Sequence, residues 1–312
     1  VLCTITSAQT KSYALNFKPY LGLNSGKTDY VIDIKIPYEG YIYFLKSQLE
    51  FPLDQTMIGG SAELKLQSGT KREWVLNLGF YTNVNDPNGK MYDHDWWNIR
   101  TGMTEKFSYT ESKSEGNNNI FLVEIDKLII ISKKVNISIS GGFKYQKIEQ
   151  EIYGFSGWQF DLDSIHFDID SPDIHGLSYE VAYKLPNAGF KINYFLNQKL
   201  TFYSRIAYTR AIISDFDDHL LRFKTTESSI NGNGLLADFG LHMDFGPTPG
   251  KGFFVEFNGD FTYIKASGTS TQSWYGDDPA GEEDETGQSV SGIPHEISTT
   301  QFRLGLVLGL GF

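Results

Sequence analysis

The chain has 312 residues, a formal net charge of −11 and 15% aromatic residues. The negative charge argues against nucleic acid as a partner, whereas it would attract cationic ligands toward an acidic cleft. The aromatic content favours β structure, because aromatic side chains suit a pleated surface. No apolar run reaches the roughly 18 residues of a transmembrane helix. The strands of a membrane barrel alternate apolar with polar residues and keep a low mean hydropathy, so a membrane protein is not excluded.

The first residues look like the end of a secretory signal, with an apolar start followed by small residues at Thr6 and Ala8. An ordinary mature N-terminus fits this stretch equally well. We expect a signal remnant over residues 1–8 and a single barrel domain over residues 9–312. Cys3 is the single cysteine, so no disulfide can form within the chain.

Segments that read as β-strands recur along the whole chain, several of them with apolar residues at every second position. They lie near residues 13–23, 31–36, 62–66, 74–80, 120–131, 135–145, 177–183, 190–195, 200–213, 235–245, 253–264 and 302–312. In the last segment one face is wholly apolar and the other is mostly small or polar. A soluble sandwich would turn the apolar face inward, and a membrane barrel would turn it toward lipid. The terminal Phe312 resembles the C-terminal signature of bacterial outer-membrane proteins.

Short and long connections alternate between these segments. The short ones lie near residues 68–71, 132–134, 196–198 and 246–252, and the long, polar ones near residues 86–112, 155–175, 214–232 and 267–297. Short turns on one side and long loops on the other are typical of an up-and-down membrane barrel. We therefore predict an all-β fold: a ten-stranded antiparallel up-and-down transmembrane β-barrel with long extracellular loops.

Two of the long connections are rich in acidic residues. These residues are Asp161, Asp163, Asp168, Asp170 and Asp173 in one, and Asp277, Asp278, Glu282, Glu283, Asp284 and Glu285 in the other. Neither has the spacing of an EF-hand calcium loop. Because charge runs usually remain in water, we expect solvated loops and predict no metal site and no cofactor.

The strand predicted over residues 200–213 is followed by Asp215, Asp217 and His219. If the strand continues past Ser214, these three side chains share one face, because successive residues of a strand point to opposite sides. A carboxylate beside a histidine can fix its tautomer and raise its basicity. The alternative for this stretch is a solvated acidic hairpin tip.

A second acidic pair, Asp93 and Asp95, follows a turn signal at residues 85–89 and precedes two tryptophans. These two carboxylates also share a face if the backbone is extended. A metal site and a coincidence within acidic loops are the alternatives.

With these motifs the chain resembles the omptin family of outer-membrane aspartyl-type proteases. The matching runs are Met91-Tyr92-Asp93-His94-Asp95-Trp96, Ser214-Asp215-Phe216-Asp217-Asp218-His219, Ser25-Gly26-Lys27-Thr28, Ser47-Gln48-Leu49-Glu50-Phe51, Lys184-Leu185-Pro186 and the final strand. They occur in the family's order and spacing and span the mature chain.

The resemblance implies an outer-membrane endopeptidase whose active site faces the cell exterior. Asp217 and His219 would form a dyad on one wall, and Asp93 with Asp95 a pair on the opposite wall. A water held between Asp93 and His219 would attack the scissile carbonyl, with no metal required. Two nearby carboxylates oppose each other's ionisation, so we expect Asp93 and Asp95 to share a proton.

The resemblance also implies cleavage next to Arg or Lys, read by acids at the cleft floor. Asp215 matches one of these acids directly. Asp29 can fill the second place only by shifting the alignment one residue, because the unshifted position holds Tyr30. Glu111 is a candidate for the acid that reads the residue after the cut. A basic preference is therefore expected, and a strict dibasic one is not.

Family members bind lipopolysaccharide phosphates through basic residues on the outer face. Here Lys147 stands where the family has an acid and Glu149 where it has Arg, so lipopolysaccharide dependence stays open, with Arg210 as another basic residue that could serve. We expect a monomer in outer-membrane lipid that acts on polypeptides with basic residues.

Two other functions compete with the protease. One is a catalytically weak or inactive barrel that acts as an adhesin or host-protein receptor; the presence of all four expected catalytic residues argues against it. The other is a porin, which is disfavoured because ten strands enclose little open lumen.

Overall fold

The computed structural model describes residues 13–38, 41–98, 105–160, 165–246, 251–279 and 284–312. The expected signal remnant, residues 1–8, lies outside the described residues, as do Asp161, Asp163, Glu282 and Glu283. Twelve antiparallel strands and one 3-10 turn account for nearly all of the described chain.

The elements follow one another along the chain. They are β1 (Tyr13–Tyr38), β2 (Tyr41–Pro52), β3 (Gln55–Leu66), β4 (Trp74–Asn83), β5 (Lys90–Trp97), β6 (Glu105–Ile131), β7 (Val135–Phe160), β8 (His166–Phe195), β9 (Leu200–His219), η1 (Leu220–Arg222), β10 (Lys224–Asp244), β11 (Gly252–Trp274) and β12 (Ser289–Gly311).

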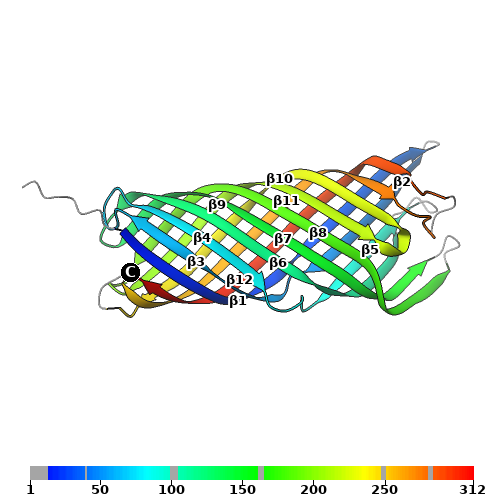
Figure 1. Cartoon of the computed structure of the whole chain (residues 1–312). Coiled ribbons are helices and arrows are strands. Elements are labelled where there is room, and N and C mark those ends of the chain that lie inside the picture. Colours follow the sequence, from blue (N-terminus) through cyan, green and yellow to red (C-terminus); the bar gives the residue numbers. More distant parts are fainter. Residues whose placement is uncertain (1–12, 39–40, 99–104, 161–164, 247–250, 280–283) are drawn as a thin grey trace, which may run out of the picture.

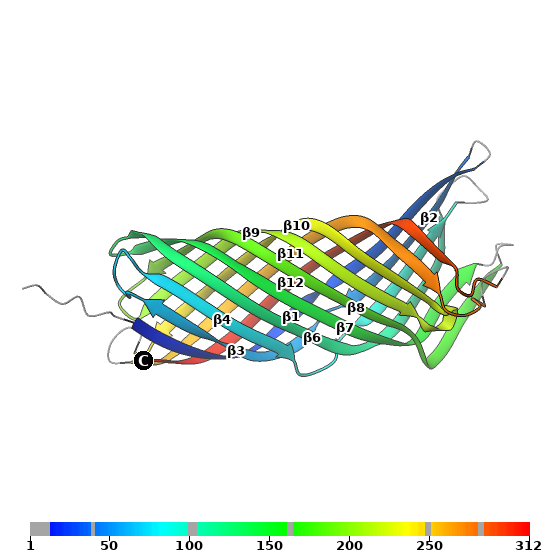
Figure 2. The same cartoon turned by 45° about the horizontal axis from the view of Figure 1, so that its top comes forward.

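The strands form one closed ring, seen from two directions in Figures 1 and 2. Pairing of β1 with β12, from Asn16 opposite Gly311 to Ile32 opposite His295, closes it. β2 and β3 lie end to end along β1, and β4 and β5 lie end to end along β6. Each of these two pairs is one interrupted barrel strand, so the twelve strands occupy ten positions around the ring. The predicted ten-stranded barrel is confirmed.

Both ends of the described chain lie at the short-turn end of the barrel. The amide of Phe312 donates to the carbonyl of Leu15 at 2.9 Å. Figure 1 places β2 and β5 toward the opposite end, and Figure 2 does the same for β2. At that opposite end the predicted long loops are in large part strand. β7 extends to Phe160 and β8 begins at His166, while only η1 and Phe223 separate β9 from β10. Polar side chains do not end a strand whose backbone groups are hydrogen-bonded to a neighbour on each side. The polar composition of these stretches therefore predicted loops where the strands of the barrel continue.

The outer face carries a band of exposed apolar residues toward the short-turn end, and charged residues join the apolar ones toward the long-hairpin end. Phe202, Ile206 and Tyr208 of β9 are exposed, as are apolar residues of the neighbouring strands. Such a band is what a barrel presents to lipid. Beyond it, the exposed or half-exposed outward residues include Glu180 and Glu227. Inward residues next to these two therefore lie outside the lipid band.

Among the described residues, no helix is long and apolar enough to cross a membrane.

Inside the barrel, the inward residues of β9 pass through three layers. Arg205 lies in a polar network near the short turns. Ala211 and Ile213 are fully buried in an apolar layer that also contains Phe51 and Tyr183. Asp215 and the residues after it form a second polar layer near the long hairpins. The apolar layer fills the middle of the lumen, which further disfavours an open pore.

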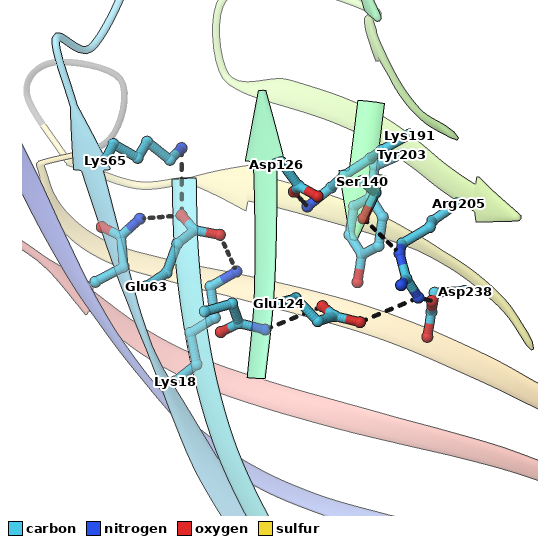
Figure 3. A network of polar contacts seen from close by, with 12 residues as sticks. Lys18, Glu63, Lys65, Glu124, Asp126, Ser140, Lys191, Tyr203, Arg205 and Asp238 are labelled. Atoms are coloured by element: carbon cyan, nitrogen blue, oxygen red, sulfur yellow. Dashed lines mark hydrogen bonds and ion pairs between the residues drawn. The ribbon is translucent and has the colours of Figure 1, made fainter. Parts of the chain in front are cut away.

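The lower polar network pairs its buried charges closely (Figure 3). Lys18 Nζ lies 3.1 Å from Glu63 and 3.4 Å from Glu256. Arg205 lies 3.0 Å from Glu124 and 2.9 Å from Asp238. Buried ions persist where a partner of opposite charge offsets their desolvation, and this network supplies those partners.

Candidate active site

β9 continues as a strand through Ser214 to His219, and it brings three predicted site residues to the inner wall. Its last residue, His219, is paired on one side with Leu177 of β8 and on the other with Lys224 of β10. Asp215 and Asp217 point inward because they alternate with outward residues such as the exposed Phe216.

β5 supplies the second carboxylate pair. Asp93 and Asp95 are paired with β2 on one side and β6 on the other. The hydroxyl of Ser108, an inward residue of β6, donates a hydrogen bond of 2.7 Å to Asp95 Oδ2. This bond fixes the Asp95 carboxylate on the inner wall, so both acids of the motif share one face.

The two walls face each other at the long-hairpin end. The charge of Asp217 acts on Asp93 across the lumen, as do the charges of Arg222 and Lys224. Asp93, Asp95, Asp217 and His219 thus meet in one cluster although β5 and β9 are more than 100 residues apart.

The dyad consists of His219 Nε2 and Asp217 Oδ1, 3.3 Å apart. Burial raises the pKa of the Asp217 carboxyl to about 7, while the hydroxyls of Tyr30 and Thr226 beside it act in the opposite direction. Burial, helped by the charge of Lys224, lowers the pKa of the His219 imidazole to about 3. The imidazole is therefore neutral near pH 7 and able to accept a proton.

The opposite wall holds a carboxyl group that resists ionisation. Burial, and after it the negative charge of Asp95, raises the pKa of Asp93 well above its usual range. Within the described chain, Asp93 Oδ1 is buried without a hydrogen-bond partner. These surroundings favour the protonated form of the Asp93 carboxyl group.

A buried cation, Lys224, completes the cluster and was missed in the sequence. Lys224 is 7% exposed, and its ammonium group lies 5.9 Å from the centre of the Trp274 ring. Burial lowers its pKa, whereas the carboxylate of Asp217 raises it. Only the pairing of the two strands reveals this lysine. Lys224 lies opposite His219 in the β9–β10 hairpin, because the turn between the strands is short.

Arg222, in the turn that follows His219, binds a residue of the stretch after β11. Arg222 Nε donates to Asp278 Oδ2 at 2.9 Å, and the Asp278 side chain is fully buried. The expectation of a solvated acidic loop is therefore wrong for Asp278, because the guanidinium group compensates its charge. In the other acidic stretch, Asp168, Asp170 and Asp173 are exposed as expected. No group of three or more metal-ligating side chains occurs among the residues with described positions.

Asp215 lies deeper on the same wall as the dyad, and its carboxylate is already engaged. Ser228 donates a hydrogen bond to Asp215 Oδ1, and His295 Nε2 lies 3.2 Å from Oδ2. The side chains of Asp215 and His295 are both fully buried. The ring of Tyr30 covers His295 at a centroid distance of 4.5 Å. The sequence placed Asp215 correctly but gave no sign of this second histidine.

The structure does not bring Asp29 and Glu111 to the cluster. Asp29 lies between the buried Thr28 and Tyr30, so it points outward, where its carboxylate is 2.9 Å from the ammonium of Lys27. Glu111 also faces outward and accepts hydrogen bonds from Tyr109 and Lys90. The shift of one residue that Asp29 needed turns its side chain to the other face of the strand.

Comparison with known proteins decides the family. The Omptin family model matches residues 21–307. This chain belongs to the omptin family. The omptin fold is also seen in the outer membrane protease OmpT from Escherichia coli, which is 16% identical, with 96% of this chain and 98% of that chain covered and a TM-score of 0.79. The omptin described here is thus an outer-membrane barrel with the fold of a protease.

Other solved barrels are much less similar. The toluene transporter TodX from P. putida is 9% identical over 95% of this chain and 90% of its own, with a TM-score of 0.27. A Pseudomonas aeruginosa FadL homologue is 7% identical over 96% and 90%, with a TM-score of 0.24. No curated protein matches this omptin in sequence.

Proposed function

We propose that this omptin is an endopeptidase that hydrolyses peptide bonds with a water molecule activated between the two walls of the cluster. The observation that carries the proposal is that the two walls hold groups of opposite chemical function, a base on one and an acid on the other. A neutral His219 is backed by the buried Asp217, and on the other wall burial favours the protonated form of Asp93. A base and an acid whose surroundings hold them in the required protonation states are the arrangement that acid–base hydrolysis needs.

These residues can account for every proton transfer in the proposed reaction. Since His219 Nε2 faces Asp217, Nδ1 is the nitrogen that takes a proton from water as the oxygen bonds to the scissile carbon. Asp217 then stabilises the imidazolium ion. Asp93 donates a hydrogen bond to the carbonyl oxygen, and the proton on His219 passes to the leaving amine when the C–N bond breaks.

The substrates in this proposal are polypeptides, and the negative charge of the protein attracts cationic ones. Direct selection of Arg or Lys, by contrast, would rest on Asp215, because Asp29 and Glu111 face away. The carboxylate of Asp215 accepts a hydrogen bond from Ser228 and lies 3.2 Å from His295 Nε2. We therefore propose hydrolysis without a requirement for a basic residue at the cut.

We propose that the cluster faces the cell exterior and that the barrel acts as a monomer in outer-membrane lipid. Short turns lie on the inner side in barrels of this kind, which puts the long hairpins outside.

The outward Lys147 lies 2.7 Å from Glu149 and 3.0 Å from Glu180. Two carboxylates thus already neutralise this position, and it gives no support to a lipopolysaccharide phosphate site there. Arg210 is exposed on the outer face of β9 and stays a candidate.

The test is hydrolysis of a quenched fluorescent peptide library by the refolded barrel in EDTA. We expect turnover by the unmodified protein and a loss of about 10³-fold or more in His219→Ala, because the general base is removed. His242→Ala is the matched control: His242 also lies between two acids, at 3.4 Å from Asp244 and from Glu256, but in the lower network. Absence of turnover, equal loss in both variants, or restoration by zinc after EDTA would contradict the proposal.

A further inference from the structure

The wall beneath the dyad holds a second acid–histidine pair, Asp215 and His295, which the proposed reaction does not use. The two side chains are 3.2 Å apart and both are fully buried. Asp215 comes from β9 and His295 from β12, so the contact crosses the lumen between strands that are not neighbours in the sheet. The pair therefore occupies the floor of the site, meaning the space beneath the dyad around Asp215.

The other groups described around the pair are a hydroxyl group and aromatic rings. Ser228 from β10 bonds Asp215 Oδ1. Tyr30 from β1 packs on the His295 ring, and Tyr179 from β8 lies edge-on to Tyr30 at 6.0 Å. Tyr30 and Tyr179 are 1% and 2% exposed, respectively. The floor is therefore filled by an imidazole and two phenol rings.

We infer that His295 is a specificity-determining residue: its imidazole occupies the place over Asp215 that the side chain of a substrate Arg or Lys would need. Asp215 lies one pleat below Asp217 on the same wall, at the depth that a long cationic side chain would reach from a peptide bond held at the dyad. The occupied place makes this omptin indifferent to a basic residue at the cut. The inference rests on the proposed peptidase activity for its biological meaning. That His295 occupies the place over Asp215, the occupied pocket of the tests below, follows from the distance between the two side chains alone.

Removing the imidazole should turn the floor into a cation site. His295→Ala deletes a ring of five heavy atoms and leaves the Asp215 carboxylate buried without its partner. A planar guanidinium group has four heavy atoms and binds carboxylates through paired hydrogen bonds, so it fits the vacated space in size and charge. The substitution should therefore create a preference for Arg that the unmodified protein lacks.

The first experiment compares kcat/KM on two peptides that differ only in Arg or norleucine before the cut. We expect a ratio within about threefold of one in the unmodified protein, and a ratio at least about tenfold larger in His295→Ala, the size of effect a buried charged hydrogen bond has. The double variant His295→Ala/Asp215→Asn should return to the original ratio. A ratio in His295→Ala equal to that of the unmodified protein would overturn the inference.

A single Asp215→Asn variant keeps the test decisive if the alanine variant does not fold. With His295 in place, this variant should leave the Arg-to-norleucine ratio as it is in the unmodified protein. If the unmodified protein instead prefers Arg about tenfold or more and Asp215→Asn abolishes the preference, then Asp215 reads the substrate and His295 does not block it.

The second experiment needs no turnover. Agmatine, a small guanidinium compound, is titrated into each folded barrel by calorimetry. Binding to His295→Ala, with none to the unmodified protein or the double variant, supports the occupied pocket even if no peptide is cleaved by any form. Equal binding to all three, or to none, contradicts it. Failure of the peptidase proposal is thereby distinguished from failure of this inference.

Discussion

In the lower lumen, Arg205 lies 3.0 Å from Glu124 and 2.9 Å from Asp238, so one buried cation holds two carboxylates. In the upper lumen, Asp217 is fully buried and, within the described chain, neither of its oxygens accepts a well-formed hydrogen bond. The same barrel thus satisfies its acids at one end and leaves an acid poorly satisfied at the other. Buried charge without full compensation costs stability, and sites that keep it are commonly functional.

The comparison separates charges that hold the barrel together from charges available for chemistry. An apolar layer that includes Phe51 and Tyr183 lies between the two regions. It separates the cations of the lower network from the acids of the upper cluster, so those cations do not offset the burial of Asp93 and Asp217.

The largest effect we expect comes from breaking the lower network. Arg205→Met removes the buried guanidinium group and should lower the free energy of unfolding by about 3–5 kcal/mol. Its ion pairs with the partly exposed Glu124 and Asp238 and its hydrogen bonds to Ser140 and Asn187 are lost together. Urea unfolding of the refolded barrel in detergent, followed by tryptophan fluorescence, measures the change. Arg210→Met, on the exposed outer face of the same strand, is the control and should change it little. Equal stability of the Arg205 variant and the control would show that the lower network does not stabilise the fold.

The opposite sign is expected in the upper cluster. The pKa of Asp217 is raised from 3.8 to about 7, so stability falls as the pH rises through that window and the full penalty applies above pH 7. Asp217→Asn should therefore raise the free energy of unfolding at pH 8 by on the order of 2–4 kcal/mol, with little gain near pH 4. It should also lower activity.

The same unfolding assay at pH 8 and pH 4 measures this gain. Asp126→Asn in the lower network is the matched control, and it should destabilise, since it leaves Lys191 without the carboxylate that lies 3.0 Å away. Destabilisation of both variants at pH 8 would remove the distinction between the two regions.

A smaller change in rate is expected from the acid on the other wall. Asp93→Asn keeps the shape of the side chain but cannot transfer a proton or donate through a hydroxyl. It should lower kcat about 100-fold, the usual contribution of one positioned acid. Steady-state kinetics on one good peptide measures it, with Asn77→Ala in the lower lumen as a control. A rate equal to that of the unmodified protein would exclude Asp93 from the chemistry.

The smallest effect is expected from a hydroxyl next to the dyad. The hydroxyl of Tyr30 lowers the pKa of Asp217, opposing the effect of burial. Tyr30→Phe should therefore shift the acidic limb of the pH–rate profile upward by less than about one unit, with the same plateau rate. A downward shift would show that the hydroxyl does not favour the ionised carboxyl.

Much of this architecture follows from alternation along the chain. A period of two residues gave the barrel, its closing strand and the shared face of Asp215, Asp217 and His219. Polarity was a poor guide to the loops, because strands toward the long-hairpin end carry many polar residues and still pair with their neighbours. The residues after His219 were taken for loop on these grounds, although β10 begins at Lys224.

The parts of the site that the sequence did not reveal depend on contacts across the lumen. Lys224 needed the register of the β9–β10 hairpin, and His295 needed the closure of the ring. The prediction for Asp29 failed for a local reason. Thr28 and Tyr30 point into the barrel, so the side chain between them points outward and cannot reach the site. Short motifs place residues on a face, but only the closed barrel shows which faces meet.

The pH dependence of kcat/KM tests the central claim most directly, because it reports the dyad and the protonated acid together. The Asp217 carboxyl group takes up a proton as the pH falls through about 7, after which it can no longer stabilise the imidazolium ion that forms when His219 accepts a proton from water. The refolded barrel, assayed on one quenched peptide in EDTA from pH 4 to pH 10, should gain activity through about pH 7. It should lose activity again at higher pH, when Asp93 gives up its proton. A profile that is flat from pH 5 to pH 9, or one that Asp217→Asn leaves unchanged, would contradict the account.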